Sequence, residues 1–326
     1  MRIGIPRALW YYTYAPFWTV FFTELGAEVV PSRPTTRQTL DVGVTACVSE
    51  ACLPIKLYFG HVIDLAERVD YMFVPRLMCL HGNRVFCPKF LGLPDLVRHS
   101  GLQLPPLLDV KLDRRTGPLF LWRACRQLGR RLGASDRRIV RAYLRAGDEQ
   151  RRYDARLLAG ALPAGAKPLP QPKPGQPAET TSPLRVALLG YPYLIFDDYI
   201  NLGLLAKLQR LGVSYRTIET VPERLLNRQN HLFPKRPFWR YGDLVARSGY
   251  HFLGPGADDV DGVIHVTAFA CGPDALIDKL LEMEAARQGR PYLNITLDEQ
   301  SGEAGYVTRL EAFIDMLRRR EASSHA

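Results

Sequence analysis

Residues 2–9 read RIGIPRAL, and residues 184–193 read LRVALLGYPY. In each stretch a short apolar run ends in a Gly-x-Pro motif, Gly4-Ile5-Pro6 or Gly190-Tyr191-Pro192. A helical pattern follows each motif. Both helical patterns end in Leu-Gly, at Leu25-Gly26 and at Leu211-Gly212. A buried strand followed by a helix is the repeating unit of parallel α/β sheets. The two stretches therefore predict an α/β domain in each half of the chain.

The alternation of strands and helices continues on both sides of these stretches. In the first half, we expect strands at Arg2–Ile5, Glu28–Val30 and Tyr71–Pro75, and helices at Leu9–Leu25, Leu53–Arg68 and from about Lys89. In the second half, we expect strands at Leu184–Leu189, Val213–Ile218, Val260–Val266 and Pro291–Leu297, and helices at Tyr199–Leu211, Pro273–Gln288 and Gly305–Arg319. This rhythm predicts two Rossmann-like or flavodoxin-like parallel sheets with helices on both faces.

The domain boundary is expected in a proline-rich stretch. Leu162–Pro183 contains seven prolines and has no hydrophobic period, which is typical of a linker. The predicted domains are therefore residues 1–161 and 184–326. A chain of 326 residues is long enough for two such domains.

Composition favours a globular protein inside the cell. The chain is 47% hydrophobic and 23% charged, and it contains no apolar run of the length, about 18 residues, that a membrane span requires. The first residues lack the basic start and the small-residue cleavage site of a secretory signal. We therefore expect a cytoplasmic location and no contact with a membrane.

The net charge of +10 is concentrated in one segment. Residues 114–156, predicted to be helical, hold thirteen Arg and four acidic residues, a net charge of +9. The ordinary explanation is a solvated helical face, and an acidic protein or the phosphates of a coenzyme would also match it. Nucleic acid is an unlikely partner, because no known recognition module accompanies the charge.

One aromatic stripe is expected to be structural. Trp10, Tyr14, Trp18 and Phe21 recur at helical spacing in the first predicted helix. Such a stripe most often packs in a core or a subunit interface, so we interpret it as packing.

Three of the six cysteines share a local context. Cys52 precedes Leu-Pro, Cys87 precedes Pro, and Cys271 precedes Gly-Pro, each at the start of a predicted helix. We expect all three thiols at the carboxyl ends of strands and at helix N-termini, where α/β sheets bind ligands. The partial positive charge of a helix N-terminus is expected to lower their pKa.

Thiols in the reducing cytosol point to metal or redox chemistry rather than to disulfides. No C-x₂-C pair occurs, which disfavours structural zinc. The 34 and 183 residues between the three cysteines favour an iron–sulfur cluster held from both domains, in the cleft between them. Cys47 and Cys79 are reserve ligands. Cys125 fits an apolar helix stripe, and any single cysteine is more often a core residue than a ligand.

Other side chains near these cysteines have a functional and a structural interpretation. His61 could donate to the cluster or to a substrate, although a satisfied core histidine is commoner. Lys56 and Lys89 could offset the negative charge of a cluster, or they could be solvated. Asp298, Glu299 and Glu303 could act as acids or bases, or they could be carboxylates at a helix N-terminus. Glu299 and His61 are the catalytic candidates.

Several longer motifs carry a family resemblance. They are Gly4–Leu9 (GIPRAL), Glu50–Lys56 (EACLPIK) with Gly60-His61, Cys87-Pro88-Lys89 with Gly92–Asp95 (GLPD), Gly190–Tyr193 (GYPY), Phe269-Ala270-Cys271, and Asp298–Gly305 (DEQSGEAG) continuing to Thr308–Phe313 (TRLEAF). In these motifs the chain resembles the CoA-protein-activase-related proteins, relatives of the 2-hydroxyacyl-CoA dehydratase cluster subunits. The resemblance covers nearly the whole chain except its Arg-rich and proline-rich middle.

The resemblance implies Rossmann-like domains around an oxygen-sensitive 4Fe–4S cluster with Cys52, Cys87 and Cys271 as ligands. Some relatives carry a double-cubane cluster instead. The cluster would receive single electrons from a separate ATP-hydrolysing activator, and in the dehydratases such an electron makes a ketyl radical from a 2-hydroxyacyl-CoA. A related second subunit, or a second copy of the chain, is implied as a further partner. The chain itself has no G-x-x-x-x-G-K-[ST] phosphate loop.

Two alternatives to a redox protein stay open from the sequence. The chain could be a non-catalytic scaffold or binding module of the same fold without a cluster. A weaker alternative is a nucleic-acid binder that uses residues 114–156.

Overall fold

A computed structural model describes residues 1–169, 184–257 and 259–324 of the chain. Its contacts divide it into two compact units. The first unit comprises Met1–Gly165 with Phe238–Tyr241, and the second comprises Ala166–Pro237 with Gly242–Ala326. Most of the predicted linker, residues 170–183, lies outside the described residues. The two units are described separately below.

The first unit is built on a parallel sheet of four strands. These are β1 (Arg2–Ile5), β2 (Glu28–Pro31), β3 (Tyr71–Phe73) and β6 (Leu107–Leu108), in the order β2-β1-β3-β6. In chain order this is second, first, third, fourth, which is the flavodoxin order. The first strand is buried because its residues are apolar and it lies between two neighbours. The predicted parallel sheet is therefore confirmed here.

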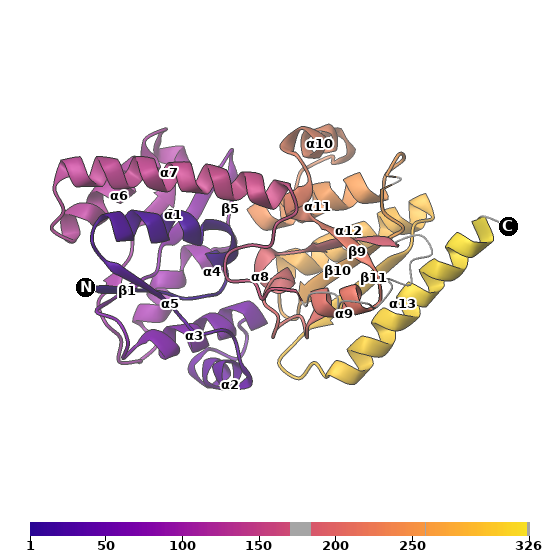
Figure 1. Ribbon diagram of the computed structural model, residues 1–326, viewed down its shortest axis with the longest axis horizontal. Coiled ribbons are helices and arrows are strands. Elements are labelled where there is room, and N and C mark those ends of the chain that lie inside the picture. The colour runs from indigo at the N-terminus through magenta and orange to yellow at the C-terminus, as the bar shows by residue number, and fades with distance from the viewer. Residues whose placement is uncertain (170–183, 258, 325–326) are drawn as a thin grey trace, which may run out of the picture. The chain divides into compact units, whose positions relative to one another are not determined.

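Helices and a small second sheet surround this parallel sheet. The helices are α1 (Tyr11–Glu24), α2 (Arg37–Ala46), α3 (Leu53–Leu65), α4 (Pro88–Leu91), α5 (Leu93–Arg98), α6 (Phe120–Arg131) and α7 (Asp136–Leu158). The small sheet has the order β5-β4-β7, from β4 (Arg76–His81), β5 (Arg84–Val85) and β7 (Lys111–Asp113). The long helix α7 runs beside α1 (Figure 1).

Aromatic side chains fill the core of the first unit. Trp10 and Phe21 are fully buried, Trp18 is 3% exposed, and the Trp18 and Phe73 ring centroids are 4.6 Å apart. This confirms the packing role expected for the aromatic stripe. It also explains why α1 tolerates so many aromatic residues, since they contact one another and β3.

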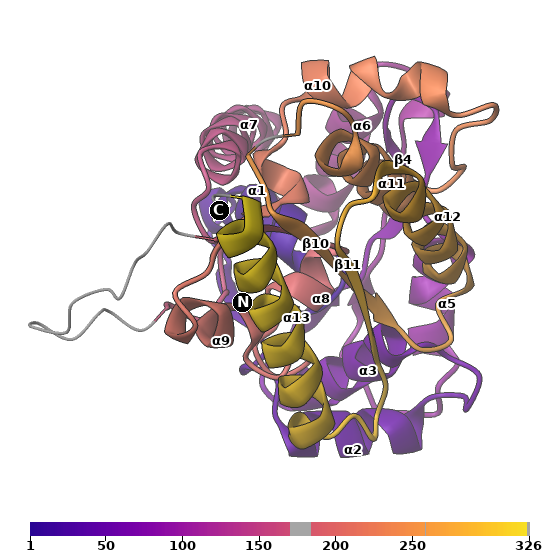
Figure 2. The ribbon, with the colours of Figure 1, turned by 90° about the vertical axis from the view of Figure 1, so that its right-hand side faces the viewer.

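The second unit has a parallel sheet with the same strand order. Its strands are β8 (Arg185–Gly190), β9 (Ser214–Thr217), β10 (Gly262–Ala268) and β11 (Tyr292–Leu297), in the order β9-β8-β10-β11. Its helices are α8 (Pro192–Ile195), α9 (Leu204–Arg210), α10 (Glu223–Arg228), α11 (Arg240–Leu253), α12 (Gly272–Gln288) and α13 (Glu303–Ser324). Figure 2 shows α13 on one side of β10 and β11, and α11 and α12 on the other.

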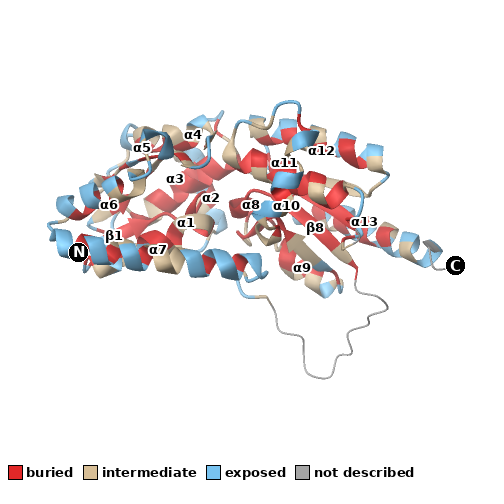
Figure 3. Cartoon of the chain, turned by 90° about the horizontal axis from the view of Figure 1, so that it is seen from above, coloured by how far each residue is buried: buried red, intermediate tan, exposed pale blue. Residues whose placement is uncertain are grey.

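Burial follows this layered pattern. In Figure 3 the strands β1 and β8 are drawn as buried, whereas much of the surface of α7 is exposed. All seven residues of β10 are buried, as expected for a central strand covered on both faces. Within the described residues, no helix has the length and apolar character needed to cross a bilayer.

Most predicted elements are confirmed to within a few residues, and the differences have local causes. The helix expected at Tyr199–Leu211 begins only at Leu204, because Gly203 has a left-handed backbone with φ of +72°. The helix expected from about Lys89 starts at Pro88 and is divided at Gly92 into α4 and α5. The Arg-rich segment is helical, as α6 and α7.

Candidate functional site

Cys52 and Cys87 occupy equivalent positions in the first unit. Cys52 is the N-cap of α3 and Cys87 is the N-cap of α4, both with extended backbone (φ −68°, ψ 153° and φ −64°, ψ 158°). A proline follows in the first turn of each helix, where its missing N–H costs no hydrogen bond. The expectation that both thiols lie at helix N-termini is therefore confirmed.

The two thiols are close enough to influence each other. Burial raises the pKa of Cys52 to about 11, and the neighbouring Cys87 adds to the rise, whereas the Ile55 backbone N–H and Lys89 oppose it. Burial also raises the pKa of Cys87, although the backbone N–H groups of Phe90 and Lys89 lower it. The expected lowering of these pKa values is wrong, because desolvation of a thiolate outweighs the helix N-terminus.

Cys47 and two lysines belong to the same region. Cys47 ends α2, and although burial raises its pKa, the charges of Lys89 and Lys56 lower it. Lys56 is only 8% exposed, on the first turn of α3. We call Cys47, Cys52, Cys87, Lys56 and Lys89 the first-unit thiol site. Its chemistry is three sulfur atoms beside two cationic side chains.

Cys79 and Cys125 lie in other surroundings. Cys79 is buried in β4, where its thiol donates to the Gly82 carbonyl at 3.3 Å and its neighbouring charges are Arg115 and Asp113. Cys125 is fully buried in α6, and burial raises its pKa well above the usual range. The expectation that Cys125 is a core thiol is confirmed.

Cys271 lies in the second unit, at the carboxyl end of β10. It is the N-cap of α12, and its N–H donates to the Ala268 carbonyl at 3.1 Å. Ala270, just before it, has a left-handed backbone with φ of +62°. Cys271 therefore lies where sequence reasoning expected it. By contrast, Cys52 follows the helix α2 rather than a strand, and Cys87 follows the two-residue β5 of the small sheet.

The proximity of Cys271 to Cys52 and Cys87 stays a prediction. Within the described residues, no three His, Cys, Asp or Glu side chains form a ready metal-binding group. In the first unit, the thiol pair has the donor chemistry of an iron–sulfur ligand set, because thiolates are the protein ligands of such clusters.

His61 lies in the core of the first unit. Its Nδ1 is 2.9 Å from the Ser32 hydroxyl and its Nε2 is 3.1 Å from the Thr35 hydroxyl. Burial lowers its pKa to about 3, with Asp64 opposing and Arg7 reinforcing this effect. A neutral imidazole with both nitrogens bonded matches the structural alternative. Its catalytic role stays a prediction.

The predicted acidic residues lie between β11 and α13. Asp298 accepts from the Gln300 N–H at 2.8 Å and from the Ser301 hydroxyl at 2.9 Å, so it organises its own loop. Glu303 starts α13 and pairs with Lys207 at 2.9 Å. These contacts match the alternative of carboxylates at a helix N-terminus. Glu299 is partly exposed in the same loop, and its catalytic role stays a prediction.

Sequence reasoning missed a buried polar network in the second unit. His265, in the middle of β10, faces Asp274 and Asp278 on α12 and Tyr292 on β11. The available signal was a histidine inside an apolar strand, followed by two aspartates one helical turn apart. None of these residues stands in the motifs that suggested a cluster.

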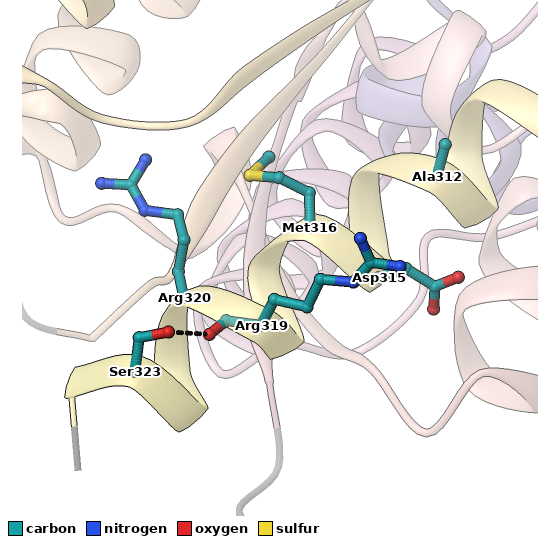
Figure 4. A pocket seen from close by; sticks show the side chains of 6 residues that line it. All are labelled: Ala312, Asp315, Met316, Arg319, Arg320 and Ser323. Carbon is teal, nitrogen blue, oxygen red and sulfur yellow. Dashed lines mark hydrogen bonds between the residues drawn. The ribbon is translucent and has the colours of Figure 1, made fainter. Parts of the chain in front are cut away.

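Two surface grooves lie apart from these groups. One is lined by α13 residues Ala312, Asp315, Met316, Arg319, Arg320 and Ser323, and Figure 4 shows these side chains along the helix. Another lies between the end of α1 and the start of α7. Neither of these two grooves is lined by a predicted site residue.

A comparison with protein families gives one match. Residues 2–221 match the model of the family described as the CoA enzyme activase uncharacterised domain. The match covers the first unit up to Gly165 and the first two strands of the second unit, so it includes Cys52 and Cys87 but ends before Cys271. No curated protein matches the chain significantly.

Proposed function

Because the chain belongs to the family of the CoA enzyme activase uncharacterised domain, we propose that it is an iron–sulfur protein of the 2-hydroxyacyl-CoA dehydratase type. The ligands of a 4Fe–4S cluster are Cys52, Cys87 and Cys271. A separate ATP-hydrolysing activator protein supplies low-potential electrons, and the substrate class is an acyl-CoA. Cys47 is the nearest reserve ligand if the cluster is a double cubane instead.

The pairing of Cys52 with Cys87 carries this proposal. The two thiols are separated by 34 residues in sequence, yet both cap proline-started helices, and the proximity of Cys87 contributes to the raised pKa of Cys52. Both are only partly exposed, and this partial burial disfavours a bare thiolate. A bound metal removes this obstacle, because its positive charge replaces the protons and deprotonates the ligands.

Lys56 and Lys89 support an anionic occupant. Their charges lower the pKa of Cys47, and Lys89 acts in the same direction on Cys52 and Cys87. When bound, a cluster supplies one-electron transfer at low potential. The two ammonium groups stabilise negative charge at this edge of the unit and therefore favour the reduced state.

Iron and sulfide content after anaerobic purification tests the proposal. Wild-type protein should be coloured and contain both elements. Cys52→Ala, Cys87→Ala and Cys271→Ala should each lose most of the iron, because each removes a ligand. Cys125→Ala is the matched control: its thiol is buried in α6, and its iron content should equal that of wild type.

Two outcomes would contradict the proposal. Retention of iron in all three variants would show that these cysteines are not the ligands. Colourless, iron-free wild-type protein after anaerobic reconstitution would instead favour a scaffold or binding module without a cluster.

A further inference from the structure

The network around His265 links β10 to the first two turns of α12. His265 and Asp274 are fully buried. His265 Nε2 is 3.5 Å from Asp274 Oδ1, and Nδ1 is 3.1 Å from Asp278 Oδ1 and 2.9 Å from the Tyr292 hydroxyl. Asp274 and Asp278 are one turn apart on the same helix face. One imidazole therefore contacts two successive turns of α12.

The geometry favours a charged imidazole. Each ring nitrogen faces a carboxylate oxygen, and imidazole presents N–H groups from both nitrogens only when it is protonated. Asp278 Oδ1 also accepts from the Tyr292 hydroxyl at 2.7 Å and from Asn294 Nδ2 at 2.6 Å, as expected for an ionised carboxylate.

Asp274 gives an independent reason for the positive charge. Within the described part of the chain, neither of its oxygens nor His265 Nε2 has a hydrogen-bond partner, so their 3.5 Å approach is an ion-pair contact rather than a hydrogen bond. Burial alone would lower the pKa of His265, but Asp274 and Asp278 outweigh it and raise the pKa to about 9.

The segment between β10 and α12 carries Cys271. Only Phe269, Ala270 and Cys271 separate the strand from the helix, and Ala270 adopts a left-handed conformation that an L-residue rarely takes. The Ala275 N–H donates to the Cys271 carbonyl at 3.0 Å, the first hydrogen bond of the helix. The His265 contacts therefore join the two elements on either side of this corner.

We propose that His265 is a positioning residue for Cys271. Its contacts with Asp274 and Asp278 fix the start of α12 against β10, and this sets the position of the Cys271 thiol. The biological purpose of that position rests on the proposed function, in which Cys271 is a ligand. The positioning itself is a property of the chain without a cluster.

The contacts of His265 with Asp274 and Asp278, which we call the clamp, weaken as the pH rises. The groups that face His265 are Asp274 and Asp278 on α12 and Tyr292 on β11, while β8 places apolar Leu189 beside it in the sheet. An opened corner exposes an ordinary histidine, whose pKa is about 6.5. The protonated His265 therefore stabilises the closed corner fully below about pH 6.5, and this stabilisation is lost by about pH 9. Between these values the equilibrium constant for closing falls by at most about tenfold per pH unit.

Hydrogen exchange of the full-length, cluster-free protein tests the clamp. The reporter is the Ala275 amide, with rates corrected for the intrinsic pH dependence of exchange. Wild-type protection should fall between pH 6.5 and 9, by about tenfold or more. His265→Gln should show low protection that does not change with pH. His251→Gln, in α11 of the same unit, is the matched control and should behave like wild type.

Alkylation by iodoacetamide, resolved by residue, then reports on Cys271 itself. At pH 7, His265→Gln should react at Cys271 about tenfold faster than wild type, with Cys52 and Cys87 unchanged as internal references. Equal Cys271 rates in both proteins would overturn the proposal. A wild-type Ala275 protection that is constant from pH 6.5 to 9 would also overturn it, and this measurement needs no variant to fold.

The result is separable from the fate of the proposed function. Iron-free wild-type protein that shows the pH-dependent clamp would refute the cluster and retain the positioning role. Iron-loaded wild-type protein whose Ala275 protection does not change with pH would support the cluster and refute the positioning role.

Discussion

Two buried histidines differ in charge because different groups face their ring nitrogens. His61 faces two hydroxyls, from Ser32 and Thr35, which accept or donate as a neutral imidazole requires. His265 faces two carboxylates, which accept only. Burial is common to both and disfavours charge. The partners therefore decide that His61 is neutral and His265 is an imidazolium.

His61 should make the protein less stable in mild acid. Its pKa is about 3 in the folded chain and about 6.5 in an unfolded one, so below about pH 6.5 the unfolded state binds the extra proton. The free energy of unfolding should fall by up to about 1.4 kcal/mol for each pH unit below that value. Urea unfolding of wild type and His61→Gln at pH 7 and at pH 5.5 measures this effect.

The difference between the two proteins isolates His61 from other titrating groups. At pH 7 we expect His61→Gln to cost about 1–3 kcal/mol, because two buried hydroxyls lose their partner. At pH 5.5 the cost should shrink by about 1 kcal/mol. A cost that is the same at both pH values would contradict a neutral, buried His61.

At the scale of elements, close contact between α2 and α3 supports the first-unit thiol site. Cys47 ends α2 and Cys52 begins α3. A Cβ atom on Gly43 would lie 2.1 Å from the Lys56 carbonyl oxygen, and one on Gly60 would lie 2.0 Å from that of Thr39. Only glycine permits this approach, so the two helices are held with their backbones in contact.

Gly60→Ala should therefore destabilise the protein. The added methyl group meets backbone atoms that cannot rotate away, and overpacking of this kind costs about 1–3 kcal/mol or more. Gly147→Ala in α7 is the control, since its new Cβ would meet only Arg151 Nη1 at 3.6 Å. That variant should be neutral or stabilised by up to about 1 kcal/mol through helix propensity. Equal urea midpoints for the two variants would contradict the close packing.

Most strands of the two parallel sheets and long helices such as α1 and α12 were predictable because their patterns are strong, whereas β6 and α11 were not predicted. Buried strands such as β8 and β10 are nearly continuous apolar runs between turn residues, and the cysteine N-caps were readable from the prolines after them. Helix α2 was missed because only Leu40 and Gly43 are buried in it, which leaves almost no hydrophobic period. The small sheet was missed because its strands are two to six residues long and mixed in polarity.

The site was less predictable than the fold. Local sequence places Cys52, Cys87 and Cys271 at helix N-termini, but thiol pKa values depend on burial, which comes from tertiary packing. The His265 network depends on three elements, β10, α12 and β11, that are adjacent only in the folded sheet.

At the scale of the whole molecule, the two units repeat one topology. In each sheet the first strand lies between the second and the third. The Gly-x-Pro motifs at residues 4–6 and 190–192 lie at the carboxyl ends of these first strands. The short sequence repeat therefore corresponds to a structural repeat. The carboxyl ends of the first and third strands are the ligand-binding edge of such sheets, and Cys271 lies at this edge in the second unit.

Part of the positive charge of residues 114–156 is paired, although the segment keeps a net charge of +9. Four arginines of α6 and α7 form ion pairs with nearby carboxylates: Arg130 with Asp136, Arg145 with Glu24, Arg151 with Asp148, and Arg156 with Glu149. These pairs reduce the field that would attract a phosphate backbone. Such pairs are typical of a solvated helical face.

Protection of individual thiols tests the central claim most directly. Anaerobically reconstituted protein and the cluster-free protein would be alkylated in parallel, and each cysteine quantified separately by mass spectrometry. If Cys52, Cys87 and Cys271 hold one cluster, all three should become unreactive together when iron and sulfide are bound, while Cys47 still reacts. Unchanged reactivity of any one of the three in iron-loaded protein would contradict the account.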